Sequence, residues 1–152
     1  MQIKDIFNPT TAAELKQRID QLSPASRPLW GKMSVSQMLA HCNVIYELAY
    51  DNKYPKPNPL MRLLLKLLVK NKVVNETPYK QGSPTAPVFR VTNEKDFEFE
   101  KNRLINHIEK TQKLGATHFE GREYHSFGSL TAQEWNNMFY KHLDHHLRQF
   151  GV

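Results

Sequence analysis

Hydrophobic positions recur at helical spacing in four main segments of this chain. The segments run from about 11 to 22, from 34 to 51, from 94 to 113, and from 131 onward. Three of them open on a Ser or Thr with Glu or Gln three residues later, as in Thr11–Glu14, Ser34–Gln37 and Thr131–Glu134. Such pairs form capping boxes, whose side chains accept the amide hydrogens that a first helical turn leaves free. Four main helices are therefore predicted.

A shorter fifth helix is predicted from Pro59 to Lys70, in "NPLMRLLLKLLVK". Asn58 can cap it and Pro59 suits the first helical position. Only the short "PVFRV" at 87–91 is typical of a strand, and the long connections at 54–58 and 78–93 are expected to line a functional mouth. We expect one domain, 1–152: an all-α, up-and-down four-helix bundle with an extra short helix and long crossover loops.

Net charge, hydropathy and cysteine content limit the classes of function that this chain can have. The net charge of +6 favours anionic small molecules, but the acidic residues are interleaved with the basic ones and no nucleic-acid reader motif occurs. No apolar run reaches the roughly 18 residues of a spanning helix, and the start lacks the pattern of a signal peptide. The single cysteine, Cys42, cannot form an internal disulfide and is expected to be a small core residue. These features favour a cytoplasmic protein.

Two histidines of the last predicted helix share its apolar side. His142 and His146 are four residues apart, so both project from one face about a turn from each other. Trp135, Phe139 and Phe150 fall on the same side by their spacing. A pair of imidazoles at this spacing can bind one ion, although a surface pair would have the same sequence.

A third histidine stands on an apolar stripe of the second predicted helix. His41 shares this face with Met38, Ile45 and Leu48. Taken alone, such a histidine is more often hydrogen-bonded to a carbonyl or an acid within a core. Together with His142 and His146, it favours one divalent ion held by three imidazoles. Zn, Ni, Co and Fe all suit this donor set, and zinc is preferred on abundance.

Three further polar residues are candidates for lesser roles. His125 lies in the loop before the last helix, where it could relay protons or could simply be solvated. His145 lies 100° around the helix from His146, as a catalytic neighbour or an exposed group. Gln149 could hydrogen-bond across the bundle in support of the site, or could be a plain helix-end residue.

Two stretches carry a resemblance to a known superfamily. "LWGKMSVSQMLAHC" and "HLDHHLRQF" resemble the DinB/YfiT-like proteins, and together with "GSPTAP" they are similar to a branch described only as a domain of unknown function. The resemblance implies a four-helix bundle that holds one divalent ion through His41, His142 and His146, with His145 outside the ligand set. It also implies thiol-dependent S-transferase or hydrolase activity in some members, and dimers in many.

Three ligands leave a coordination position open, as in catalytic rather than structural zinc sites. We therefore expect a metal-dependent transferase, with a low-molecular-weight thiol as cosubstrate, or a hydrolase, in either case acting on a small molecule. The alternative is a non-enzymatic helical module with structural histidines. It would bind a partner or membrane through the 59–70 helix, where Arg62, Lys66 and Lys70 form a basic stripe. We interpret this helix as packed on the core or in a homodimer with its cations facing water, rather than on a membrane.

Overall fold

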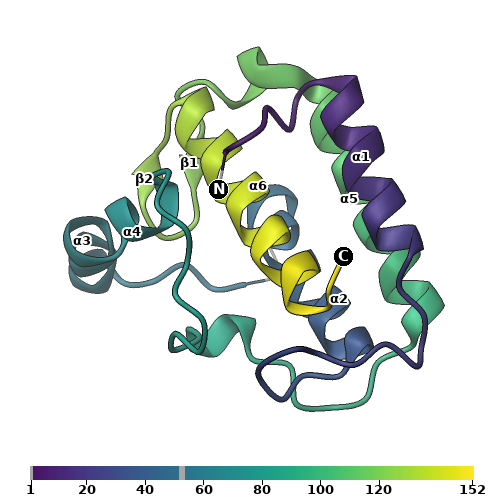
Figure 1. Cartoon of the computed structure of the whole chain (residues 1–152). Helices are drawn as coiled ribbons and strands as arrows, with labels where there is room; N and C mark the ends of the chain where they lie inside the picture. The colour runs from purple at the N-terminus through teal and green to yellow at the C-terminus, as the bar shows by residue number, and fades with distance from the viewer. Residues whose placement is uncertain (1, 52–53) are drawn as a thin grey trace.

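The computed structural model describes residues 2–51 and 54–152 and is mostly helical, as the sequence predicts (Figure 1). In chain order the elements are α1 (Pro9–Asp20), α2 (Val35–Tyr50), α3 (Pro59–Leu68), α4 (Lys70–Val74), the 3₁₀ turn η1 (Pro87–Phe89), α5 (Phe97–Phe119), β1 (Glu123–Tyr124), β2 (Gly128–Ser129) and α6 (Ala132–Gln149). The two strands pair antiparallel as a very short hairpin, which the sequence pattern does not predict.

The two helices that carry the candidate histidines begin where their capping boxes predict. The Ser34 side chain accepts from the amide of Gln37, and the Gln37 side chain accepts from the amide of Ser34. Thr131 and Glu134 make the same reciprocal pair at the start of α6. Asn58 caps α3 through the amide of Met61, also as predicted. These starts depend on side chains within one turn, so the local sequence specifies them.

Two predicted helix starts and one predicted strand are wrong. α1 starts at Pro9 rather than Thr11, because Asn8 caps it by accepting from the amide of Thr10. α5 starts at Phe97 behind Asp96 rather than at 94. Its predicted end near 113 is confirmed, because Gly115 breaks the helical geometry at φ 71°, and a further helical segment continues from there to Phe119. The stretch 87–91 contains the turn η1 instead of a strand, since Pro87 fixes a turn-compatible φ.

The core lies where α2, α5 and α6 meet. α2 packs along α5, α6 contacts α2, α4 and α5, and α1 contacts α5. Tyr46 of α2 stacks on Phe139 of α6 at a centroid separation of 4.8 Å, and the fully buried Trp135 packs against Phe139. This packing holds α2 and α6 in a fixed relation, and with them the histidines they carry.

The helix α3 stands apart from this core. It lies with α4 at one edge of the molecule, away from the long helices (Figure 1). None of its ten residues is fully buried, and of its apolar side chains Leu65 alone packs against the core, so core packing, one of the two arrangements expected for this helix, is limited to one leucine. Only Leu65 and Arg62 are half-buried, because they lie on the side of the helix that faces the body.

Hydropathy along the helices agrees with the sequence pattern. Within 2–51 and 54–152, none of the helices has the length and apolar character needed to cross a bilayer.

Candidate metal centre

The structure brings His41, His142 and His146 together between α2 and α6. One ring nitrogen from each lies within 4.8 Å of the others, a grouping that could hold a metal ion. All three side chains are buried, with 4%, 9% and 8% of their residue surface exposed. His41 and His142 are 101 residues apart in the sequence, and the packing of α2 against α6 brings them together.

Two of the three imidazoles have their outer nitrogen hydrogen-bonded away from the cluster. His41 Nδ1 donates to the carbonyl of Phe89 at 2.8 Å. His146 Nδ1 donates to Gln149 Oε1 at 2.8 Å, since Gln149 Nε2 is itself the donor to the Trp30 carbonyl at 2.6 Å. These bonds leave the Nε2 atoms of His41 and His146 as bare lone pairs. Metal-ligating histidines characteristically have such an outer acceptor, which sets tautomer and ring orientation.

The third imidazole faces the first directly. Nε2 of His142 lies 2.9 Å from Nε2 of His41, while its buried Nδ1 has no hydrogen-bond partner among the described residues. Two ring nitrogens approach this closely only when they share a proton or a cation. Two nitrogens at about 2.0–2.1 Å from one tetrahedral ion are roughly 3.3 Å apart, so only a small shift of His142 would place both as ligands.

Burial keeps these side chains in the neutral form that binds metals. Desolvation lowers the pKa of His41 and holds that of His142 well below its ordinary value. Desolvation and the charge that His41 would carry also lower the pKa of His146 to about 3. Neutral imidazoles with converging lone pairs are the donor set of a zinc-type site, so the residues present fit a divalent ion.

A glycine makes room for the supporting glutamine. Gly31 has φ +84°, and a Cβ built on it would lie 2.6 Å from Gln149 Nε2. Any other residue would both strain the backbone and displace the amide that bonds His146. The sequence pattern does not indicate this role of Gly31, or the roles of the Trp30 and Phe89 carbonyls. The only available signal is that Trp30 and Gly31 open the stretch "LWGKMSVSQMLAHC".

The long connection between α4 and α5 covers the cluster. The Phe89 ring packs against His41 and His142 at centroid separations of 5.5 and 5.7 Å. This segment therefore orients His41 through its carbonyl and restricts water through its side chain.

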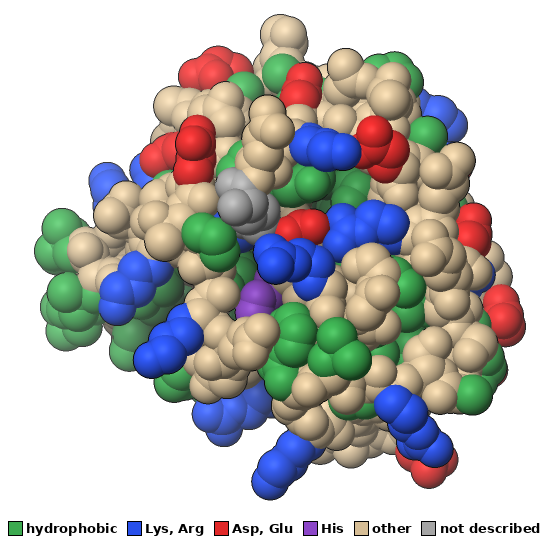
Figure 2. Space-filling view, in the orientation of Figure 1, with side chains coloured by type: hydrophobic (Ala, Val, Ile, Leu, Met, Phe, Trp, Pro, Cys, Tyr) green, Lys and Arg blue, Asp and Glu red, His purple; other side chains and the backbone are tan. Residues whose placement is uncertain are grey.

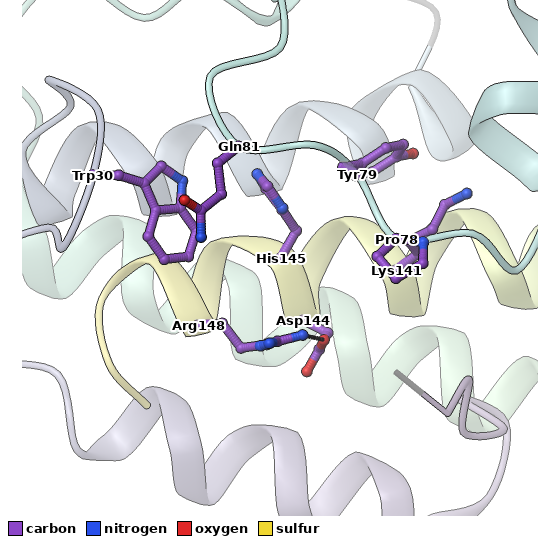
Figure 3. A pocket seen from close by; sticks show the side chains of 8 residues that line it. All are labelled: Trp30, Pro78, Tyr79, Gln81, Lys141, Asp144, His145 and Arg148. Carbon is purple, nitrogen blue, oxygen red and sulfur yellow. Dashed lines mark ion pairs between the residues drawn. The ribbon is translucent and has the colours of Figure 1, made fainter.

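A pocket of about 260 Å³ opens beside the cluster, along α6. It is lined by Trp30, Pro78, Tyr79, Gln81, Lys141, Asp144, His145 and Arg148 (Figure 3). His145 meets the rings of Trp30 and Tyr79 edge-on, and its centroid lies 5.0 Å from that of His146. His145 is therefore the pocket residue that joins this cavity to the histidine cluster.

Most charged side chains in the pocket wall bond to residues outside the pocket. Lys141 Nζ donates to the carbonyls of Lys72 and Asn75 at the end of α4, and burial lowers its pKa to about 8. Asp144 pairs with Arg18 at 2.8 Å. In Figure 3, Asp144 and Arg148 point away from the side where His145 meets Trp30. The remaining wall is thus largely aromatic and amide.

His125 and Cys42, which the sequence also singles out, lie outside the three-histidine cluster. His125 stands in the β1–β2 hairpin, where Nε2 donates to the Pro55 carbonyl at 2.9 Å and Nδ1 meets Ser126 Oγ at 3.0 Å. Its contacts join the hairpin to the segment before α3, not to the three histidines. Cys42 is buried with Sγ 3.7 Å from Met38 Sδ, which confirms the prediction of a core residue.

Fold and site together define a mainly helical protein with a buried three-histidine cluster able to hold a metal ion. A family model described as "Protein of unknown function (DUF1569)" matches residues 7–151. The chain belongs to that family, since the match covers almost its whole length. Comparison with curated proteins and with solved structures gives no match.

Proposed function

We propose that this protein is a divalent-metal-dependent enzyme acting on a small molecule, as a transferase using a low-molecular-weight thiol or as a hydrolase. One observation carries the proposal: three neutral, buried imidazoles from two helices bring ring nitrogens within 4.8 Å of one another. The facing Nε2 atoms of His41 and His142, 2.9 Å apart, support the proposal further, because they bring two buried ring nitrogens to one point where a cation can bind.

Each residue around the cluster has a role in this proposal. His41, His142 and His146 would hold the ion, and a bound ion would supply Lewis acidity that lowers the pKa of a water or thiol. The Phe89 carbonyl and Gln149 hold two of the rings in the ligating tautomer. The pocket beside His145 would bind the substrate against Trp30 and Tyr79.

Of the two catalytic candidates, His145 is the one we retain. Its ring lines the pocket and touches His146, so it can contact a substrate that approaches the cluster. His125 is engaged by Pro55 and Ser126 in the hairpin, which favours a structural role.

Several finer proposals accompany this function. We interpret α1, α2, α5 and α6 as an up-and-down four-helix bundle of the DinB/YfiT-like type, supported by their mutual packing and by one histidine on α2 with HxxxH on α6. Zinc is the preferred ion on abundance. A cytoplasmic location is supported by the single, buried Cys42. A homodimer is retained as a proposal on the superfamily resemblance alone.

Metal analysis tests the proposal directly. Protein purified without chelator or affinity-tag nickel should contain about one divalent ion per chain, because three ligands and a supporting hydrogen-bond shell converge on one point. The double variant His41→Ala, His142→Ala should lose the ion. His118→Ala, which changes a histidine outside the cluster, should keep it.

Activity then separates the two reaction classes. A panel of small electrophiles with and without low-molecular-weight thiols should show turnover that depends on both His41 and added metal. A well-folded protein with near-zero metal, and no gain in thermal stability on adding zinc, would refute the metal-dependent function.

A further inference from the structure

The exposed surface of α3 is almost entirely apolar. Six large side chains of this ten-residue helix are 42–69% exposed: Leu60, Met61, Leu63, Leu64, Leu67 and Leu68. At 100° per residue they occupy one arc about 160° wide, on the side away from Leu65 and the protein body. Isolated exposed leucines are ordinary, but a contiguous patch of this kind marks a surface that contacts something other than water.

The positive charge of the protein is concentrated around the same helix. Residues 54–75 contain five cations and no Asp or Glu, and the rest of the chain has 16 cations against 15 acids. The five are Lys56, Arg62, Lys66, Lys70 and Lys72. Nearly all of the net charge of +6 therefore surrounds the apolar arc. In Figure 2, green side chains project at the α3 edge of the molecule with blue side chains next to them.

A hollow beside α3 collects three of these cations. It measures about 500 Å³ and lies between α3 and the β1–β2 hairpin, with Lys56, Arg62 and Lys66 in its wall. Glu123 is its only acidic wall residue, and it pairs with Arg62. Lys56 and Lys66 are exposed, so the hollow presents positive charge directly beside the leucines.

We propose that α3 docks on a membrane surface rich in anionic phospholipid. Its leucines would enter the boundary between headgroups and acyl chains, and Lys56 and Lys66 would contact lipid phosphates from the hollow. Lysine stems are long enough to keep their ammonium groups at headgroup level while neighbouring leucines insert. A ten-residue helix is about 15 Å long, so this helix would lie in the interface and not cross it.

The charge distribution favours lipid over a second copy of the chain. A twofold interface centred on α3 would bring two sets of five cations together. Of the nearby acids, Glu123 and Glu134 already pair with Arg62 and Lys70, which leaves the exposed Glu76, two residues after α4, against five cations. An anionic bilayer instead supplies many phosphates, and each basic residue held near its surface adds to the attraction. This proposal reverses the sequence-based preference against membrane contact, because that preference assumed that the leucines were covered.

Vesicle flotation of the full chain tests the proposal. Wild type should float with vesicles of phosphatidylcholine containing about a third phosphatidylserine, and much less with phosphatidylcholine alone or at high salt. Leu64→Glu with Leu67→Glu, and separately Lys56→Glu with Lys66→Glu, should each weaken binding about tenfold or more. All four residues are exposed, so the fold should persist in both variants, as circular dichroism can check.

Matched variants change the same residue types elsewhere. Leu29→Glu replaces a leucine that is 70% exposed outside α3, and Lys32→Glu with Lys113→Glu reverses two exposed lysines away from it. These variants should float like wild type. Flotation that is absent, or equally strong in all variants, would overturn the proposal. So would a wild-type dimer, seen in sedimentation, that the Leu64→Glu, Leu67→Glu variant converts to monomers without any vesicle binding.

The test is independent of the metal site. Vesicle binding is expected to survive His41→Ala with His142→Ala, because α3 contributes no residue to the histidine cluster. Failure of the docking proposal would therefore leave the metal-dependent function standing, and the reverse also holds.

Discussion

At the residue scale, backbone carbonyls determine how the histidine cluster is organised. The Phe89 carbonyl fixes His41, and the Trp30 carbonyl fixes Gln149, which in turn fixes His146. Gln149 stood out in the sequence because its side chain is polar at a helix end. The two carbonyls did not, because every residue has one and only the tertiary fold selects which is used. The same limit applies to Gly31, whose value lies in the space it leaves for Gln149.

The glutamine offers the residue-scale prediction. Gln149→Ala should lower metal affinity by about 10–100-fold, as changes to groups that orient metal ligands typically do. It should also cost roughly 1–3 kcal/mol of unfolding free energy, because His146 Nδ1 and the Trp30 carbonyl lose their buried partner. Competition with a chromophoric chelator and urea denaturation measure the two effects. Gln21→Ala, at an exposed position, should change neither; equal effects in both variants would contradict the assigned role.

At the element scale, helix starts were predictable where the cap is local and its competitors are weak. Ser34 and Thr131 meet both conditions and were predicted correctly. Thr11 with Glu14 had the same pattern, yet Asn8 followed by Pro9 begins α1 two residues earlier than Thr11. Thr11 is instead buried against the core. Two cap signals so close together compete, and packing decides between them.

The start of α1 gives the element-scale prediction. Asn8→Ala should cost about 0.5–2 kcal/mol, because the amide of Thr10 loses its side-chain acceptor. Glu14→Ala should have little effect, since the Glu14 side chain makes an exposed ion pair with Lys4 and no cap bond. Thermal denaturation of both variants measures the difference. A larger loss for Glu14→Ala than for Asn8→Ala would show that Thr11 and Glu14 cap the helix after all.

At the scale of the whole molecule, the buried histidines connect global stability to pH and to metal. Folding lowers the pKa of His41, His142 and His146 below the value of about 6.5 expected in the unfolded chain. Metal-free unfolded protein therefore binds more protons than folded protein below that pH. The contribution of these histidines to the free energy of unfolding is fully present above about pH 6.5. It falls as the pH drops toward the folded-state pKa of His146, about 3.

The pH dependence gives the prediction for the whole molecule. Chelated wild type should lose up to about 1.4 kcal/mol per pH unit for each of the three histidines as the pH falls from 6.5. His142→Leu should show a shallower dependence and equal or higher metal-free stability at pH 7.5, because it removes a buried nitrogen without a partner among the described residues. Urea unfolding between pH 7.5 and 5 measures both. Parallel curves for the two proteins would contradict this account.

The sequence by itself determined the helical class, the starts of α2, α3 and α6, and the faces on which the histidines lie. Those features depend on 3.6-residue periodicity and on caps that act within one turn, both of which are local. Only the tertiary structure decided that His41 meets His142 and His146, that Phe89 and Trp30 supply the carbonyls, and that the leucines of α3 remain uncovered. Each of these depends on which segments approach one another across many residues, and periodicity records which face is apolar but not what that face contacts.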